Sequence, residues 1–112
     1  MNDYSNKFLG KIVTVSMDRP LHTKHPKHGF VYELNYGYIK GVMAPDGEEL
    51  DAYVMQVDGP YDEFTGRCVA IIHRTDDNDD KLIVVPDGQN VSDEEIIKST
   101  YFQEQFFKSV II

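Results

Sequence analysis

Short alternating apolar segments, separated by turn residues, constrain the fold of this chain more than any other feature. The clearest of them runs from Leu50 to Val57, directly after the turn-forming run from Pro45 to Gly47. Successive side chains of a strand point to opposite faces, so the apolar residues share one face while Asp51 and Tyr53 share the other. Aspartate is unfavourable inside a strand. Asp51 therefore indicates either a solvated hairpin corner or a bound cation.

Five segments of this kind are expected to form strands, and they lie at residues 11–17, 29–41, 51–57, 67–73 and 81–85. Ser92 followed by Glu95 has the pattern of a helix N-cap. Apolar residues then recur every four positions at Phe102, Phe106 and Val110, which predicts one helix face packed on the sheet. The expected fold is mainly β (α+β): a small closed or nearly closed barrel with a C-terminal helix against it.

We expect residues 1–112 to form a single domain, since the chain has no internal repeat, no low-complexity segment and no linker. Its one cysteine, Cys68, lies among apolar residues and is predicted to be a buried strand residue, not a nucleophile. The lone cysteine fits a reducing compartment. Together with the absence of a signal-peptide pattern or a membrane-spanning apolar run, it favours a cytoplasmic enzyme or binding protein.

A second acidic cluster lies between two apolar segments, in the loop from Arg74 to Lys81. Four of its residues are aspartates, at positions 76, 77, 79 and 80. Such closely spaced carboxylates repel one another unless a cation or water screens them, and a simple turn needs only one Asp or Asn. Oxygen ligands without paired cysteines favour Mg²⁺, Mn²⁺ or Ca²⁺ over Zn²⁺. The spacing does not match an EF-hand calcium loop.

The formal net charge of −8 argues against binding to a phosphate backbone, so we expect no nucleic-acid partner. The charge is uneven, with +3 on residues 1–45 and −11 on residues 46–112. This asymmetry suits an anionic ligand held together with metal ions, although chance is the alternative in a short chain. The basic loop 21–29 holds three histidines, but Pro26 opposes a single helical face and no fourth zinc ligand is evident. A solvated or anion-facing loop is the favoured interpretation.

Three motifs in order resemble the soluble family I inorganic pyrophosphatases. They are Asn35-Tyr36-Gly37-Tyr38-Ile39, Asp46-Gly47-Glu48-Glu49-Leu50-Asp51, and Asp76 to Lys81 followed by Leu82-Ile83-Val84-Val85-Pro86. The resemblance covers about residues 30–88. It implies a five-stranded OB-like barrel with helices, and hydrolysis of pyrophosphate to two orthophosphates. It also implies Mg²⁺ as cofactor, with Mn²⁺ as the alternative, and a homo-oligomer without a membrane or nucleic-acid partner.

The resemblance also implies a role for each matched residue. The metal ligands would be Asp46, Asp51, Asp76 and Asp79, with Asp77 as the rival of Asp76. The phosphate contacts would come from Lys24, Tyr36, Lys81 and Lys108. Glu48 would be the catalytic base, and Glu49 its rival.

The chain departs from the family pattern at three positions. Glu48 stands where the family signature has Asp, and Phe107 stands where the family has Tyr. Lys24 falls near the position at which the family has a phosphate-binding Arg. Lysine lacks the bidentate fork of arginine. These departures keep two alternatives open: a metal-dependent hydrolase of another phosphoanhydride, such as a nucleotide, and a catalytically weak barrel that binds phosphate or a protein partner.

Overall fold

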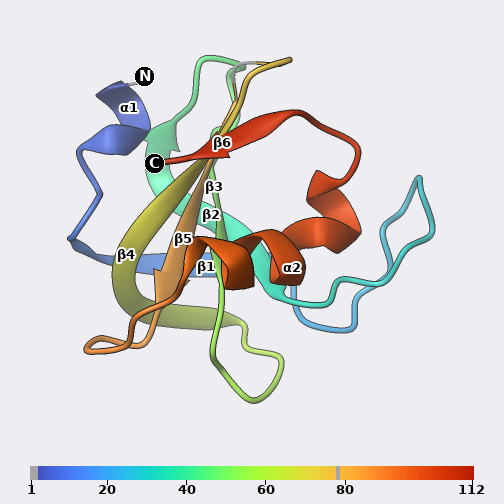
Figure 1. The fold of residues 1–112 in the computed structure, drawn as a ribbon. Coiled ribbons are helices and arrows are strands. Elements are labelled where there is room, and N and C mark those ends of the chain that lie inside the picture. The colour runs from blue at the N-terminus through green and yellow to red at the C-terminus, as the bar shows by residue number, and fades with distance from the viewer. Residues whose placement is uncertain (1–2, 78) are drawn as a thin grey trace.

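A computed structural model describes residues 3–77 and 79–112. Figure 1 shows a strongly curved sheet closed on itself, with one helix lying across its outer surface. The helices are α1 (Asp3–Asn6) and α2 (Asp93–Glu104). The strands are β1 (Ile12–Arg19), β2 (Asn35–Met43), β3 (Glu49–Val54), β4 (Glu63–Arg74), β5 (Asp80–Val85) and β6 (Ser109–Ile111).

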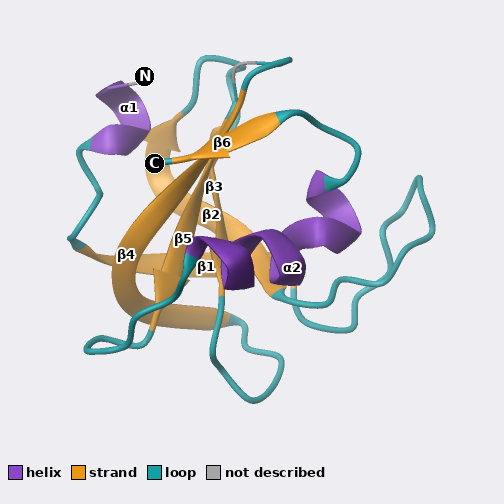
Figure 2. Ribbon diagram, viewed as in Figure 1, coloured by secondary structure: helices purple, strands orange, loops and turns teal. Residues whose placement is uncertain are grey.

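Five strands form a closed barrel in the order β1-β2-β3-β5-β4, and an additional β1–β4 pairing completes the circuit. All pairings are antiparallel except β3 with β5, which is parallel. The short strand β6 pairs with the end of β4 (Figure 2). The sequence-based prediction of a mainly β, five-stranded barrel with a C-terminal helix is therefore confirmed.

The barrel interior is filled by one face of every barrel strand. Its fully buried residues are Val15, Leu50, Ala52, Val54, Cys68, Ile71, Leu82 and Val84. The alternation predicted for β3 is thus confirmed, and so is the burial of Cys68. Burial also raises the pKa of the Cys68 thiol to about 11, which keeps it protonated and unreactive at neutral pH.

The opposite faces of β3, β4 and β5 form a second apolar layer beneath α2. In this layer Ile96 and Phe102 of the helix pack against Tyr53, Ile83 and further strand residues. The N-cap prediction is confirmed, because the Ser92 side chain accepts a hydrogen bond from the Glu95 amide at 3.1 Å. No helix among the described residues is long and apolar enough to cross a membrane.

The predicted helix face at Phe102, Phe106 and Val110 is wrong beyond its first residue. Helix α2 ends at Glu104, Phe106 lies after it, and Val110 belongs to β6. The cause is tertiary: the chain turns back so that Val110 pairs with His73 of β4. An apolar spacing of four residues contains no information about this pairing at the edge of the sheet.

Two predicted strand boundaries are also wrong. The strand expected at residues 67–73 begins earlier, at Glu63. The strand expected from residue 29 begins only at Asn35. Residues 22–32 instead form a separate excursion in which the Tyr32 amide and carbonyl bond to Thr23 and His22 at 2.8 and 2.9 Å. In Figure 1 this excursion projects from the barrel beside the end of α2.

Candidate active site

The register of two strands places an acid and a lysine side by side on the outer face of the barrel. Asp51 of β3 is the direct partner of Lys81 in the parallel β3–β5 pair. The Lys81 ammonium contacts the Asp51 carboxylate at 2.5 Å and the Asp79 carboxylate at 2.7 Å. Only 3% of the Lys81 side chain is exposed, so this charge is compensated inside the protein.

Electrostatics keep Lys81 charged. Burial alone would lower its pKa, but the negative charges of Asp51 and Asp79 outweigh that effect and the pKa is raised overall. The ammonium also lies 5.8 Å from the centre of the Tyr36 ring. A permanent cation thus lies at the junction of two acids and a tyrosine.

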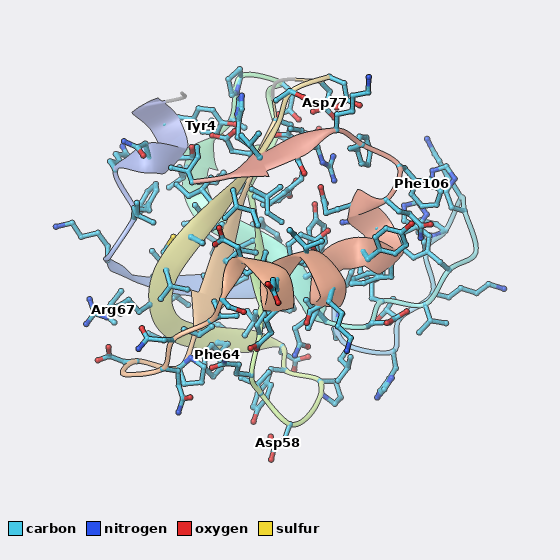
Figure 3. All side chains as sticks on the ribbon, in the orientation of Figure 1. Tyr4, Asp58, Phe64, Arg67, Asp77 and Phe106 are labelled. Atoms are coloured by element: carbon cyan, nitrogen blue, oxygen red, sulfur yellow. The ribbon has the colours of Figure 1, made fainter. Side chains whose placement is uncertain are left out.

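One side of this junction opens into a pocket of about 350 Å³, named here the carboxylate pocket, which is lined by Pro45, Asp46, Asp77 and Asp79. Two turns supply these residues, one between β2 and β3 and one between β4 and β5. Asp77 marks this end of the barrel in Figure 3. The Asp46 carboxylate accepts a hydrogen bond from the Glu48 amide at 2.9 Å, which shapes the first turn.

The other side opens into a larger pocket of about 500 Å³, named here the aromatic pocket. Charged and aromatic residues line it together: Asp18, Arg19, His25, His28, Phe30, Tyr32, Tyr36, Asp51, Arg74, Gln103, Phe106 and Phe107. Since Lys81 contacts Asp51 of this pocket and Asp79 of the carboxylate pocket, it joins the two. The carboxylate pocket therefore offers oxygen ligands for a cation, and the aromatic pocket next to it contains cationic groups.

Tyr36 can serve as a hydrogen-bond donor in this site. Burial and then the adjacent charge of Asp51 raise its pKa well above the ordinary value. Its hydroxyl is therefore neutral at physiological pH. A neutral phenol donates to an anion.

Arg74 is held rigidly at the floor of the aromatic pocket. Its Nε and Nη2 atoms donate to the two carboxylate oxygens of Glu104 at 3.0 and 2.7 Å. The Phe107 ring covers the guanidinium at 3.6 Å. Burial would lower the pKa of Arg74, but the hydrogen bonds and charge of Glu104 raise it overall. Helix α2 is thereby tied to the site.

Asp80 belongs to the barrel and not to the pockets. It is fully buried, its carboxylate contacts His73 Nδ1 at 2.6 Å, and it accepts a hydrogen bond from the Ser5 hydroxyl. Strand alternation therefore divides the acidic loop: Asp79 faces Lys81, whereas Asp80 faces α1 and His73.

The structure brings together five of the sequence-predicted site residues. Asp46 and Asp79 line the carboxylate pocket, Tyr36 and Asp51 line the aromatic pocket, and Lys81 joins them. Among the described residues, no group of three or more His, Cys, Asp or Glu side chains is already arranged to hold a metal ion.

The remaining predicted residues lie at the margins. Asp76 accepts a hydrogen bond from the Lys108 amide at 3.1 Å, and neither side chain lines a pocket. Lys24 is exposed and lines neither pocket. Glu48 is exposed next to Asp46, whereas its rival Glu49 accepts a hydrogen bond from the Gly41 amide at 2.8 Å.

Sequence reasoning missed two cations of the aromatic pocket, Arg19 and Arg74. Each lies at the end of a strand, where a polar residue is unremarkable. The sequence did carry a signal for Arg74. It lies two residues after Ile72 on β4, so both side chains point to the outer face of the barrel, towards α2. Its partner Glu104 is 30 residues away and carries no local signal.

The closed five-stranded barrel with one covering helix defines the protein as an OB-like barrel, here carrying an acidic pocket beside a cationic and aromatic one. The model of the inorganic pyrophosphatase family matches residues 8–110. The chain therefore belongs to the inorganic pyrophosphatase family, and the sequence-based recognition is confirmed.

Individual relatives agree with this assignment. The chain is 42% identical over 62 residues to inorganic pyrophosphatase 1 of Pseudomonas syringae pv. tomato, an alignment that covers 49% of this chain and 34% of that protein. The match thus spans about a third of the length of this relative.

Solved structures support the fold. The Helicobacter pylori inorganic pyrophosphatase superposes with a TM-score of 0.68 at 18% identity, covering 89% of this chain and 83% of that one. The Ehrlichia chaffeensis enzyme gives a TM-score of 0.66 at 17% identity, with coverage of 90% and 84%.

Proposed function

We propose that this chain is an inorganic diphosphatase, which hydrolyses pyrophosphate to two orthophosphates with Mg²⁺. Family membership supports the reaction class. The observation that carries the proposal is the position of Lys81, whose ammonium joins Asp51 of the aromatic pocket to Asp79 of the carboxylate pocket. An anionic substrate and its metal ions need this adjacency of cationic and anionic groups.

The residues present fit a hard divalent cation by the type of their donor atoms. The carboxylates of Asp46, Asp77 and Asp79 line the carboxylate pocket from two separate turns, and Asp51 lies across Lys81 from Asp79. Carboxylate oxygens are the donors that Mg²⁺ and Mn²⁺ prefer. We propose Asp46, Asp51 and Asp79 as ligands, with Asp77 in preference to Asp76, because Asp77 lines the carboxylate pocket and Asp76 does not. When bound, Mg²⁺ supplies charge neutralisation and acidifies the attacking water.

The chain's own groups would position the substrate. Two of the three Lys81 ammonium protons are directed to Asp51 and Asp79, which leaves a third donor for a phosphoryl oxygen. Tyr36, kept neutral by burial, lies beside it, and its hydroxyl, which interacts with Asp51 in this structure, would donate to the substrate when it turns from that carboxylate. We propose that Lys24 and Lys108 supply long-range attraction for the anion from outside the two pockets, since both are exposed.

Glu48 is the proposed general base. Its side chain is exposed at the turn that carries Asp46 and makes no hydrogen bond or ion pair to any residue that the structure describes. A carboxylate without a structural partner can accept a proton from water. Glu49 is the weaker candidate, since its carboxylate is engaged by the Gly41 amide.

The proposal extends to the setting of the enzyme. We propose that residues 1–112 act as one domain of a cytoplasmic homo-oligomer, since the surface carries large exposed apolar side chains such as Ile97 and Val110, at 58% and 52% exposure. Sedimentation velocity of the purified chain tests the oligomer. A monomer at all concentrations would contradict it.

Phosphate release from pyrophosphate tests the function. We expect wild-type protein to release orthophosphate with Mg²⁺ and not with chelator, and Asp51→Asn to lower the rate by on the order of 100-fold or more, since even outer partners of a metal site contribute 10–100-fold. Asp58→Asn is the matched control. Asp58 lies at the end of the molecule opposite to Asp77 in Figure 3, and its carboxylate accepts a hydrogen bond from the Tyr61 hydroxyl. Equal rates in the two folded variants would refute the role of Asp51.

A further inference from the structure

The aromatic pocket has a wall that pyrophosphate does not need. Its volume of about 500 Å³ lies within the range of pockets that hold organic ligands, roughly 300–1,000 Å³. Phosphate recognition requires cations and hydrogen-bond donors. Nevertheless, seven of the pocket's twelve lining residues are Phe, Tyr or His, and most of these come from the excursion 22–32 and from the chain after α2.

Three of these rings lie nearly parallel and form what is named here the aromatic wall: His28, Phe30 and Phe106. The His28 and Phe30 rings are inclined by 3° with centroids 6.2 Å apart. Phe106 is inclined by 24° to each, at 6.0 and 6.1 Å. Phe106 is 59% exposed and lies at the molecular edge in Figure 3, beside the excursion. Such a wall offers ring faces and edges to a planar ligand.

The aromatic wall is continuous with the proposed phosphate site. The Phe30 ring lies 5.4 Å from Tyr32, and Tyr32 stacks on Tyr36 at 5.5 Å with an angle of 24°. Tyr36 in turn lies 5.8 Å from the Lys81 ammonium. A ligand with its planar end at the aromatic wall could therefore extend along these rings to the border between the two pockets, where Lys81 contacts Asp51 and Asp79.

The charges around the wall are mixed. Arg19 and Arg74 line the same pocket and attract an anion, whereas Asp18 and Asp51 also line it, so the Mg²⁺ that accompanies a nucleotide would offset their charge. Burial is the largest of the effects that lower the pKa of His25, so that this ring is neutral at physiological pH. Neutral rings can stack on a base without adding charge repulsion.

We propose that this site takes phosphoanhydrides that carry a planar heterocycle, that is, nucleoside di- and triphosphates, with the base on the aromatic wall and the terminal phosphate at Lys81. The inference rests on the proposed function for its phosphate end and adds the base-binding half. In the reaction, a water oxygen forms a bond to the terminal phosphorus while the bond from that phosphorus to the bridging oxygen breaks. The bridging oxygen keeps the electron pair and leaves on the shortened nucleotide, and a water proton passes to Glu48.

Binding calorimetry of the full chain in Mg²⁺ buffer tests the proposal with two probes, ATP and tripolyphosphate. Both carry three linked phosphates, but only ATP has a base. We expect wild-type protein to bind ATP about tenfold more tightly or better, the effect of stacking one base on aromatic side chains. Phe106→Ala should remove about that factor for ATP and leave tripolyphosphate affinity unchanged, and His28→Ala should act in the same direction.

Tyr101→Ala is the matched control. Tyr101 is equally exposed, at 59%, but lies on α2 and lines a different pocket. Sedimentation velocity and thermal unfolding confirm that all variants keep the same fold and assembly. Equal affinity of wild-type protein for the two probes would overturn the inference, and so would a Phe106→Ala variant that weakens both probes alike.

The failure of this inference is distinguishable from failure of the proposed function. Protein that hydrolyses pyrophosphate but does not prefer ATP retains the proposed function and loses the aromatic wall as a base site. If the protein binds ATP more tightly in a Phe106-dependent way but releases no phosphate from pyrophosphate, the proposed function is wrong. The aromatic wall is then still supported as a base-binding site.

Discussion

Loss of the Glu104 charge should destabilise the protein strongly, because Glu104 neutralises a buried arginine. The two side chains of the Arg74–Glu104 pair are only 7% and 8% exposed, and their Nη2 and Oε2 atoms lie 2.7 Å apart. Glu104→Gln preserves the shape but removes the carboxylate that binds two guanidinium nitrogens, and leaves the buried charge with the longer contacts of Nη1 to Asp77 and Asp79, at 3.5 and 3.9 Å. Removing one member of such a buried pair costs about 3–5 kcal/mol. For a domain of this size, that loss lowers Tm by roughly 10–20 °C.

The chain contains a matched exposed pair. Arg67 and Asp87 also approach to 2.7 Å, but their side chains are 38% and 61% exposed. Asp87→Asn should therefore cost no more than about 1 kcal/mol, because water screens the charges.

Urea unfolding followed by circular dichroism measures both free energies of unfolding by linear extrapolation. Losses in free energy of unfolding that agree within about 0.5 kcal/mol between Glu104→Gln and Asp87→Asn would refute the reasoning, since surface substitutions ordinarily vary by that amount. If Glu104→Gln is largely unfolded, addition of Arg74→Met supplies a second test. Removing the buried guanidinium, which then keeps only its longer ionic contacts to Asp77 and Asp79 among the described residues, should restore part of the stability, whereas a loss caused by packing alone would not be restored.

Three further outcomes follow from the described structure. Ser92→Ala should cost about 1 kcal/mol in urea unfolding, because the Glu95 amide loses its cap, and an unchanged midpoint would contradict the cap. Gly37→Ala should cost about 3 kcal/mol or more, since its Cβ would lie 2.1 Å from the Ser16 carbonyl oxygen; near wild-type unfolding would refute this contact. The Cys68 thiol has a folded-state pKa of about 11 against an ordinary 9.0, so the folded state binds the proton more tightly. Its contribution, roughly 2–3 kcal/mol, is complete below pH 9 and lost towards pH 11. Between pH 9 and pH 11 the free energy of unfolding of Cys68→Ala should therefore fall less than that of the wild type. Parallel curves of this free energy against pH would contradict the raised pKa of the Cys68 thiol.

The barrel and half of the site could be predicted because their signals are local. Alternation across β3 decides that Leu50 faces the core and Asp51 faces outward. The two-residue spacing of Asp79 and Lys81 decides that both can point to the same side of β5. These are properties of a strand and need no knowledge of the rest of the fold.

The other half of the site depends on contacts between distant segments. Arg74 becomes a pocket residue because Glu104, on a helix 30 residues later, fixes its guanidinium. His28 and Phe106 meet because an excursion after β1 and the end of α2 converge. Strand β6 exists because β4 offers an edge. Each contact is set by tertiary packing, so neither periodicity nor composition of the sequence carries a signal for it.

The central claim is that carboxylates around Lys81 support metal-dependent hydrolysis of pyrophosphate. Its most direct test is a titration of purified, folded wild-type protein with Mg²⁺, with orthophosphate release from pyrophosphate as the readout. The account predicts a rate that rises with Mg²⁺ to saturation and disappears in excess chelator. A rate that is unchanged by chelator, or no release at any Mg²⁺ concentration from protein shown to be folded, would contradict it.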